Sequence, residues 1–313
     1  MVKTAFLFPG QGSQFVGMGK EFYDSSAEVR RMFDEASGVL QKDIATLCFN
    51  GPEEELKLTE NAQPALLIHS TIALNMLKGN GIDAVLAAGH SLGEYSANVA
   101  SGSIRFLDAV RLVQLRGRFM QEAVPVGVGG MAAIIGMPLE RISDLCKKVS
   151  GEEHLVQPAN LNSPEQIVIA GHLKAVEEVS RLADESGAKK SVMLPVSAPF
   201  HCPLMKPAEI KLKKELEQTE FLDHDFPVVC NVSAQPVTEG ALARDALVKQ
   251  VCSPVRWAET MQTLVDSGIE AVVEIGSGKV LSGLMRRFKK DIRCLQVGDP
   301  DSLKRTVEVF QQL

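Results

Sequence analysis

The run Gly89-His90-Ser91-Leu92-Gly93 constrains this chain most, because it joins two different patterns of hydrophobicity. An apolar stretch of strand length, 84–88, precedes the run, and a segment with helical periodicity begins at Ser91. Glycine on both sides of the serine allows the strand and the helix to approach closely around a sharp turn. The pattern predicts a strand–turn–helix unit that presents Ser91 at the carboxyl end of a buried strand.

Strand and helix signals alternate on both sides of this unit, as in a parallel sheet covered on both faces. The middle of the chain, 124–197, instead shows the order βαββαβ of a ferredoxin-like unit. We therefore expect an α/β fold in which 1–123 and 198–313 form a large α/β-hydrolase-like domain and 124–197 an inserted ferredoxin-like subdomain. Among the expected elements are strands at 3–8, 227–231, 271–275 and 292–297, and helices at 17–39, at 64–79 with Pro64 in the first turn, and at 106–123.

Ser91 allows two interpretations. At a helix N-terminus the backbone N–H of Leu92 is unpaired and can donate to a developing oxyanion, which suits Ser91 as a nucleophile. Alternatively Ser91 is the N-cap of the helix, and Glu94 completes a capping box. The strand–turn–helix setting favours the nucleophile, and the two interpretations are compatible.

A nucleophilic serine needs a general base, and the chain offers six histidines. His90 adjoins Ser91 on the sharp turn and is expected to support it by hydrogen bonding. His69 lies in an apolar helix and reads as a satisfied core histidine. His201, in a proline-bracketed segment at the edge of the insert, is modestly favoured. Without an acid in motif context, a backbone carbonyl or an amide side chain could orient its imidazole. The remaining histidines resemble surface positions: His154, His172 and His224.

Arg116 lies on the apolar stripe of the helix expected over 106–123, four residues after Leu112 and three before Phe119. An arginine that faces the interior must be paired. One interpretation is a structural salt bridge with a buried acid. The other is a clamp for a substrate carboxylate, which a guanidinium can bind in bidentate fashion. Periodicity alone favours the salt bridge.

Composition narrows the classes of function. The formal net charge of −6 argues against nucleic acid as the main partner. The six cysteines form no C-x-x-C pair, which suggests neither a zinc site nor a redox motif and fits reduced thiols in the cytoplasm. The N-terminal apolar run is too short for a signal peptide, and no window approaches the roughly 20 apolar residues of a membrane span.

Further motifs, taken together, resemble the malonyl-CoA:acyl-carrier-protein transacylases of bacterial fatty-acid synthesis. The resemblance follows the family's order over nearly the whole chain. It rests on Phe8-Pro9-Gly10-Gln11-Gly12-Ser13-Gln14, Gln63-Pro64-Ala65, Gly89-His90-Ser91-Leu92-Gly93-Glu94-Tyr95, Gln114-Leu115-Arg116-Gly117, Ala159-Asn160-Leu161-Asn162-Ser163-Pro164, Ser197-Ala198-Pro199-Phe200-His201, Asn231-Val232-Ser233-Ala234, Gln250-Val251-Cys252-Ser253-Pro254-Val255-Arg256-Trp257 and Glu274-Ile275-Gly276-Ser277-Gly278-Lys279-Val280-Leu281.

The resemblance implies a role for each matching residue. Ser91 takes the malonyl group as an ester, with His201 as general base and then acid. Arg116 binds the malonyl carboxylate, against the structural preference above. The remaining implied site residues are Gln11 and Leu92, whose N–H groups form the oxyanion hole, Gln250, which orients His201 through its backbone carbonyl, and Phe200, which is similar to the malonyl-selective pattern.

The implied partners are malonyl-CoA and the acidic acyl carrier protein, with no metal or redox cofactor and no membrane. A basic patch is expected where the carrier protein docks. The alternative for such a patch is a solvated helix end, where cations are favourable. We also expect a monomeric cytoplasmic enzyme. The candidates for the patch are Arg286, Arg287, Lys289 and Lys290, and secondly Lys189 and Lys190.

Two other functions compete with acyl transfer to a carrier. A serine thioesterase or esterase would share the turn at Ser91 and deliver the acyl group to water. Arg116 distinguishes a malonyl transferase from such an enzyme, because a hydrolase of neutral esters does not need this residue. A non-catalytic sensor of malonyl-CoA would keep the fold, and intact Ser91 and His201 argue against it.

Overall fold

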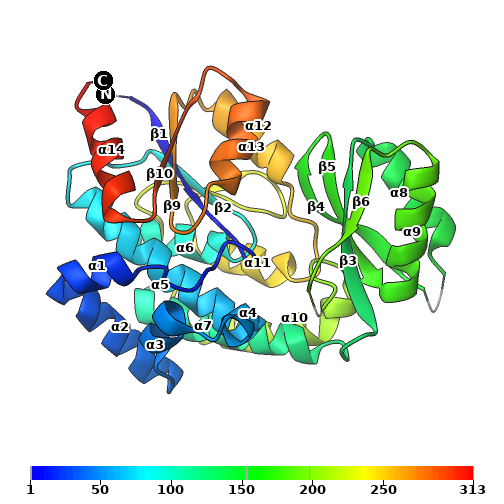
Figure 1. Ribbon diagram of the computed structural model, residues 1–313, viewed down its shortest axis with the longest axis horizontal. Coiled ribbons are helices and arrows are strands. Elements are labelled where there is room, and N and C mark those ends of the chain that lie inside the picture. The colour runs from blue at the N-terminus through cyan, green and yellow to red at the C-terminus, as the bar shows by residue number, and fades with distance from the viewer. Residues whose placement is uncertain (1, 152–153, 197, 313) are drawn as a thin grey trace.

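The computed structural model describes residues 2–151, 154–196 and 198–312. Its larger part is built on a six-stranded sheet with the order β10-β9-β1-β2-β7-β8 (Figure 1). Neighbouring strands are parallel except β8, which pairs antiparallel to β7 at the edge. The predicted parallel sheet is confirmed. Its strands are β1 (Thr4–Phe8), β2 (Leu86–Gly89), β7 (Val228–Val229), β8 (Pro236–Val237), β9 (Ala271–Ile275) and β10 (Arg293–Val297).

Helices cover both faces of this sheet. Side chains alternate along β1, so that Phe6 and Phe8 join one apolar core while Ala5 and Leu7 join the other. Helices α2, α5 and α7 contribute to the first core, and α12 and α13 to the second (Figure 1). The helices of this part are α1 (Lys20–Ser25), α2 (Ala27–Leu40), α3 (Ile44–Asn50), α4 (Glu53–Lys57), α5 (Thr59–Lys78), α6 (Gly93–Ala100), α7 (Phe106–Glu122), η1 (Pro203–Met205), α10 (Lys206–Glu217), α11 (Gly240–Gln250), α12 (Trp257–Asp266), α13 (Val280–Phe288) and α14 (Pro300–Phe310).

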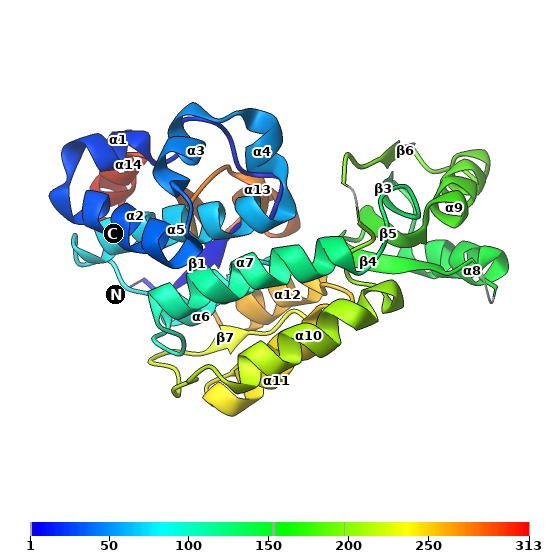
Figure 2. The same cartoon turned by 90° about the horizontal axis from the view of Figure 1, so that it is seen from below.

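A second sheet has four strands in the order β4-β5-β3-β6, with every neighbouring pair antiparallel. Its core includes residues of α8 and α9, and the element order β3-α8-β4-β5-α9-β6 confirms the ferredoxin-like arrangement. This part projects beyond the ends of α7 and α10 (Figure 2). The limits 124 and 197 stay predictions, and Ser197 is outside the described residues. The elements are β3 (Gly129–Ile135), α8 (Leu139–Val149), β4 (Val156–Ser163), β5 (Gln166–His172), α9 (Leu173–Glu185) and β6 (Lys190–Met193).

The helices before Ser91 differ from the predicted ones. The helix expected over 17–39 is two helices, because Ser26 is extended and caps α2 through its side chain. Helix α5 begins at Thr59, so Pro64 lies inside it and not in its first turn. Tertiary packing outweighs the lost backbone donor of Pro64, since most of α5 is buried.

The turn after β2 packs against the end of β1 at distances that exclude side chains. A Cβ atom on Gly93 would lie 2.0 Å from the backbone oxygen of Phe8, and one on Gly89 would lie 1.9 Å from the carbonyl of Gly93. The two glycines therefore let β1, β2 and α6 meet at one point, with Ser91 between them.

We predict that Gly93→Ala destabilises the protein by about 3 kcal/mol or more, because backbone atoms must move to admit the methyl group. The matched control is Gly38→Ala, at a site in α2 where a Cβ meets nothing within 4 Å. It should stabilise the protein by about 0.5–1 kcal/mol. Urea unfolding of both variants measures these changes, and equal stability of the two would contradict the packing argument.

Candidate active site

Ser91 lies at the carboxyl end of β2 in a left-handed backbone conformation, with φ of 53°. The side chain of Asn231 holds this turn, since its Oδ1 accepts the Ser91 N–H at 2.7 Å and its Nδ2 donates to the Gly89 carbonyl at 2.7 Å. Helix α6 begins only at Gly93, and its N-cap residue is Leu92 with no side-chain cap. The capping-box interpretation of Ser91 and Glu94 is therefore wrong.

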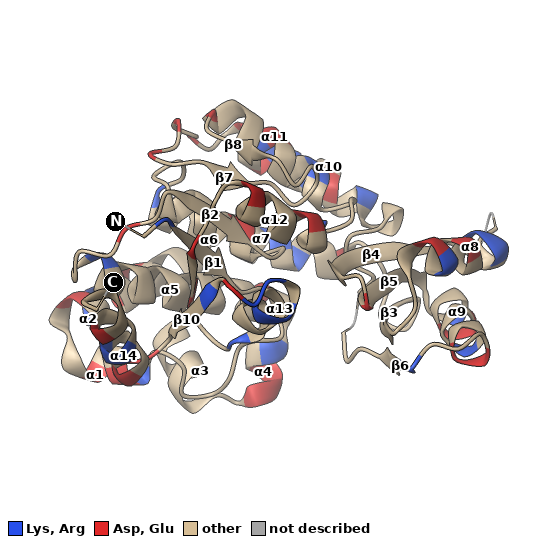
Figure 3. Cartoon of the chain, turned by 90° about the horizontal axis from the view of Figure 1, so that it is seen from above, with Lys and Arg blue, Asp and Glu red and all other residues tan. Residues whose placement is uncertain are grey.

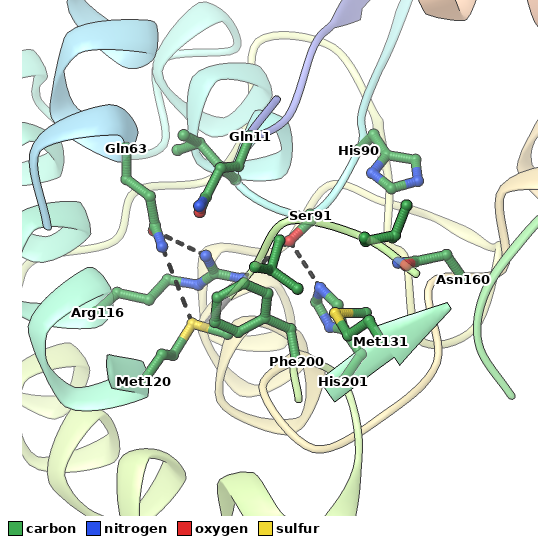
Figure 4. A pocket seen from close by; sticks show the side chains of 13 residues that line it. Gln11, Gln63, His90, Ser91, Arg116, Met120, Met131, Asn160, Phe200 and His201 are labelled. Atoms are coloured by element: carbon green, nitrogen blue, oxygen red, sulfur yellow. Dashed lines mark hydrogen bonds between the residues drawn. The ribbon is translucent and has the colours of Figure 1, made fainter. Parts of the chain in front are cut away.

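The Ser91 hydroxyl points instead to His201, which lies in the segment between β6 and η1. The distance between Ser91 Oγ and His201 Nε2 is 2.7 Å (Figure 4). On the other side of the ring, His201 Nδ1 lies 2.9 Å from the backbone oxygen of Gln250. The structure thus brings Ser91, His201 and Gln250 together in one hydrogen-bonded series. The group that orients His201 in this series is the backbone carbonyl of Gln250.

Burial and the nearby Arg116 guanidinium lower the pKa of His201 to about 3. The imidazole is therefore neutral at physiological pH. Because a carbonyl oxygen only accepts, the proton of the neutral ring must be on Nδ1, where it is donated to Gln250. Nε2 is then free to accept the hydroxyl proton of Ser91. This is the tautomer that a general base needs.

Arg116 extends from α7 into the same pocket and is 1% exposed. It forms no salt bridge within the described part of the chain, so the structural salt bridge that periodicity favoured is wrong. Its guanidinium donates to Gln63 Oε1 at 2.7 Å, to Gln250 Oε1 at 2.8 Å and to Ser91 Oγ at 3.1 Å. A cation held only by neutral groups beside a nucleophile can exchange them for an anionic ligand.

The pocket around Ser91 combines polar groups with an apolar wall (Figure 4). Gln11 and Leu92 both line it, and their backbone N–H groups have no acceptor among the described residues. They are available to an oxyanion in the pocket, as the resemblance implies. Phe200 belongs to the apolar wall, whose members are Met120, Met131, Leu194, Val196 and Phe200.

Three of the other histidines follow the expectations from the sequence, since His154 is exposed and His90 and His69 are bonded as described here. His90 turns away from Ser91, and its Nε2 lies 2.8 Å from Asn162 Oδ1. His69 is buried and bonded on both ring nitrogens, to Ser277 Oγ and the Gly298 carbonyl, each at 2.8 Å. His224 is half-buried and bonds to Ser101 Oγ, and His172 is half-buried and accepts the Leu155 N–H at 2.9 Å, so neither is a plain surface position.

Three buried polar residues of the site were missed as functional candidates. Gln63 accepts from Arg116, Asn231 holds the turn at Ser91, and Glu94 accepts from both Asn231 and Gln250. A polar residue inside an apolar run was the available signal for Gln63, and Asn231 follows a strand that ends beside Ser91. At Glu94 the spacing from Ser91 suggests only a helix cap.

A groove leads from Ser91 between α13 and the smaller sheet. The pocket at Ser91 shares Gln11, His90, Asn160 and Leu194 with a second hollow, and that hollow shares Gln166 and Leu284 with a third. Arg287 and Phe288 line the outer end. Residues 2–151, 154–196 and 198–312 contain no cluster of three or more metal-ligating side chains, and no helix there is long and apolar enough to cross a membrane.

We predict that His201 stays neutral and protonated on Nδ1 between pH 5 and 8, because its pKa of about 3 lies far below this range. Nitrogen NMR of the imidazole, assigned with His201→Ala, measures both the protonation state and the tautomer. A midpoint near 6.5 for His201 would contradict the prediction.

Comparison with known proteins agrees with this geometry. The acyl transferase domain family matches residues 5–297. The malonyl CoA-acyl carrier protein transacylase of Bacillus subtilis (strain 168) is 49% identical over 312 residues, which cover 100% of this chain and 98% of that protein. The protein of the same name from Escherichia coli (strain K12) is 45% identical over 99% of this chain and 100% of its own length.

Solved structures give the same result. The transacylase of that name from Coxiella burnetii is 39% identical with a TM-score of 0.95, over 98% of this chain and 97% of that chain. A malonyl-transacylase in complex with its type II PKS acyl-carrier protein is 45% identical with a TM-score of 0.95, over 98% and 99% of the two chains. This chain therefore belongs to the acyl transferase family, in the group of malonyl CoA-acyl carrier protein transacylases.

Proposed function

We propose that this protein transfers the malonyl group of malonyl-CoA to the phosphopantetheine thiol of an acyl carrier protein, through an ester on Ser91. The observation that carries the proposal is the buried Arg116 guanidinium, 3.1 Å from Ser91 Oγ and without a counter-ion among the described residues. It supplies a site for the free carboxylate of a malonyl group next to the nucleophile. The names of the similar proteins support the same substrate and acceptor.

In the first half-reaction His201 Nε2 takes the proton of Ser91 Oγ, which attacks the thioester carbonyl. The negative charge on the carbonyl oxygen is stabilised by the N–H groups of Gln11 and Leu92, a contribution of about 10²–10³ in rate per donor in comparable sites. The C–S bond then breaks, and His201 returns the proton to the leaving thiolate. Coenzyme A departs and the malonyl group stays on Ser91 as an ester.

The second half-reaction reverses these steps with a new thiol. His201 takes the proton of the phosphopantetheine thiol, whose sulfur attacks the ester carbonyl. The bond to Ser91 Oγ breaks, and the proton returns to the serine oxygen. Both half-reactions exchange one acyl bond for another, so the chemistry calls for no metal or redox cofactor, and ping-pong kinetics result.

Gln250 orients the base in this scheme. The imidazolium that forms in each half-reaction keeps its Nδ1–H bond to the Gln250 carbonyl, which is 2.9 Å away. A carbonyl dipole stabilises the cation less than a carboxylate does. Because His201 is neutral at physiological pH, its Nε2 has a free lone pair for the proton of Ser91.

Phe200 and the rest of the apolar wall define the acyl pocket. The wall limits the room beyond the malonyl methylene and keeps water from the ester on Ser91. Both effects favour transfer over hydrolysis, because the carrier thiol then competes with fewer water molecules.

The carrier protein docks, in this proposal, at the outer end of the groove that begins at Ser91. Arg287 lines that end beside Phe288, and neither Arg286 nor Arg287 forms an ion pair in the described part of the chain. Two of the other candidates are less available, because Lys189 pairs with Glu165 at 3.5 Å and Lys289 with Asp291 at 3.4 Å. Lys and Arg residues follow one another at the end of α13 (Figure 3). An acidic carrier protein would meet an open positive charge there.

The compartment and the oligomeric state stay predictions from the sequence. The six cysteines are all free thiols, which supports a reducing compartment such as the cytoplasm. We propose that the enzyme works there as a monomer, since the groove and the residues of the mechanism come from one chain.

Incubation with malonyl-CoA and phosphopantetheinylated carrier protein should transfer labelled malonate to the carrier. Ser91→Ala should abolish transfer and the malonyl-enzyme adduct seen by mass spectrometry.

Arg116→Ala should lower malonyl transfer by about 10²-fold or more while sparing acetyl transfer, because only the malonyl group carries a carboxylate. Equal losses for both donors would refute the clamp. Release of malonate to water, with none on the carrier, would favour the hydrolase.

The double reversal Arg286→Glu and Arg287→Glu should raise KM for carrier protein about tenfold or more at low salt and leave KM for malonyl-CoA unchanged. The matched control is Lys304→Glu with Arg305→Glu, an equal change of charge on exposed residues of α14, away from the groove. Steady-state kinetics with each substrate varied in turn separate the two effects. If both double variants raise KM for carrier protein equally, net charge and not a docking site explains the result.

A further inference from the structure

Glu94 is the one acid in direct contact with the Ser91–His201–Gln250 arrangement in the described part of the chain, and the proposed mechanism gives it no step. It lies on α6, one turn after Ser91, and is fully buried. We propose that Glu94 is a positioning residue. One of its two carboxyl oxygens, Oε2, holds both Gln250 and Asn231, and these two residues in turn position the nucleophile, the base and Arg116. This inference rests on the proposed function for the reaction in which the positioning matters.

The first connection runs through Gln250. Glu94 Oε2 accepts the Gln250 Nε2–H at 2.7 Å, and the same amide nitrogen donates to the Ser91 carbonyl at 3.0 Å. With its nitrogen held on that side, the amide must turn Oε1 to the other side, where it accepts from Arg116 at 2.8 Å. If the amide rotated by half a turn, its NH₂ group would face the Arg116 guanidinium, two donors with no acceptor. Glu94 therefore sets the direction of the Gln250 side chain.

Gln250 also connects Glu94 to the base, because the backbone oxygen of the same residue accepts from His201 Nδ1. The bond from Glu94 to the Gln250 side chain therefore restrains the residue at the end of α11 whose backbone carbonyl holds the base. One residue thus serves two catalytic groups: its side chain holds Arg116 and its backbone holds His201.

The second connection runs through Asn231. Glu94 Oε2 accepts the backbone N–H of Asn231 at 3.0 Å. The side chain of Asn231 then bonds to both ends of the turn, accepting from the Ser91 N–H and donating to the Gly89 carbonyl. Because the left-handed conformation of Ser91 is strained, these bonds help to keep the hydroxyl directed at His201.

The position of the oxygen, and not the charge, is what these connections require. Glu94 Oε1 has no hydrogen-bond partner in the described residues, and burial raises the pKa of the carboxyl to about 7. An ionised carboxylate and the carbonyl of a protonated carboxyl both accept hydrogen bonds, so Oε2 holds its two partners in either state. The charged or titratable neighbours of the carboxyl are Arg116 from α7, Tyr95 from α6 and Cys230 after β7.

Glu274 provides a comparison within the same protein. It is equally buried, and its two oxygens accept the N–H groups of Leu281 and Ser282 at the start of α13. That carboxyl closes the end of a helix and touches no residue of the proposed mechanism. Glu274 therefore serves as the control for removing a buried carboxyl contact as such.

The test compares Glu94→Gln, which loses the charge but keeps an oxygen in reach, with Glu94→Asp, which keeps the charge but withdraws the oxygen by one methylene. Single-turnover formation of the acyl-Ser91 ester is measured at saturating malonyl-CoA and acetyl-CoA. We expect Glu94→Gln to stay within about threefold of the wild type. Glu94→Asp should slow malonyl transfer by roughly 10–100-fold and lower the preference for malonyl over acetyl, because buried hydrogen bonds to Gln250 and Asn231 are lost.

Glu274→Asp should lower the melting temperature and leave the malonyl preference unchanged. If Glu94→Asp behaves like Glu274→Asp, or if Glu94→Gln is impaired as much as Glu94→Asp, the positioning role is refuted. If Glu94→Asp does not fold, Gln250→Met replaces it in the test, because this variant keeps the backbone carbonyl for His201. Gln250→Met should lower the preference for malonyl over acetyl, and an unchanged preference refutes the positioning role. A wild type that forms no malonyl-Ser91 ester overturns the proposed function instead, so the two failures are distinguishable.

Discussion

The arrangement of this site depends on the strained turn at Ser91, which brings the serine to the point where β1, β2 and α6 meet. Gly89 and Gly93 make the approach of the three segments possible, and the side chain of Asn231 binds both ends of the turn. A left-handed serine persists only where its surroundings fix it. Part of those surroundings is distant in sequence, because Asn231 follows β7. The Ser91 hydroxyl is therefore oriented only when β1, β2 and β7 are assembled in the large sheet.

Neutral groups, rather than charges, hold the two reactive side chains. His201 is oriented by a carbonyl and Arg116 by two glutamine oxygens. This choice fits a site that must bind a carboxylate, because a direct salt bridge would occupy Arg116 permanently. The buried Glu94 is placed behind Gln250 and does not compete for the guanidinium. Gln250 separates the acid from the cation and connects them at the same time.

The groove explains why the fold carries a second sheet. Residues of β3, β4 and β5 form one side of the passage from Ser91, and residues of α13 form the other. A long, flexible phosphopantetheine arm can lie in such a passage, while the carrier protein that bears it stays outside. In the function proposed above, catalysis at Ser91 and recognition of the carrier protein take place in different regions, the second at the basic end of α13.

Local periodicity and the positions of glycines predict the parallel sheet, the ferredoxin-like unit and the strand–turn–helix at Ser91. The motifs, through the resemblance, further predicted the meeting of Ser91, His201, Gln250 and Arg116. The tertiary structure shows that Ser91 is not a helix cap, that Pro64 lies inside α5, and that Arg116 has no acid as its partner among the described residues. It also places Glu94 against Gln250 and Asn231. The contacts of Glu94 join residues more than 100 positions apart, as with Gln250, and Arg116 meets Gln63 across 53 positions; no local pattern encodes such contacts.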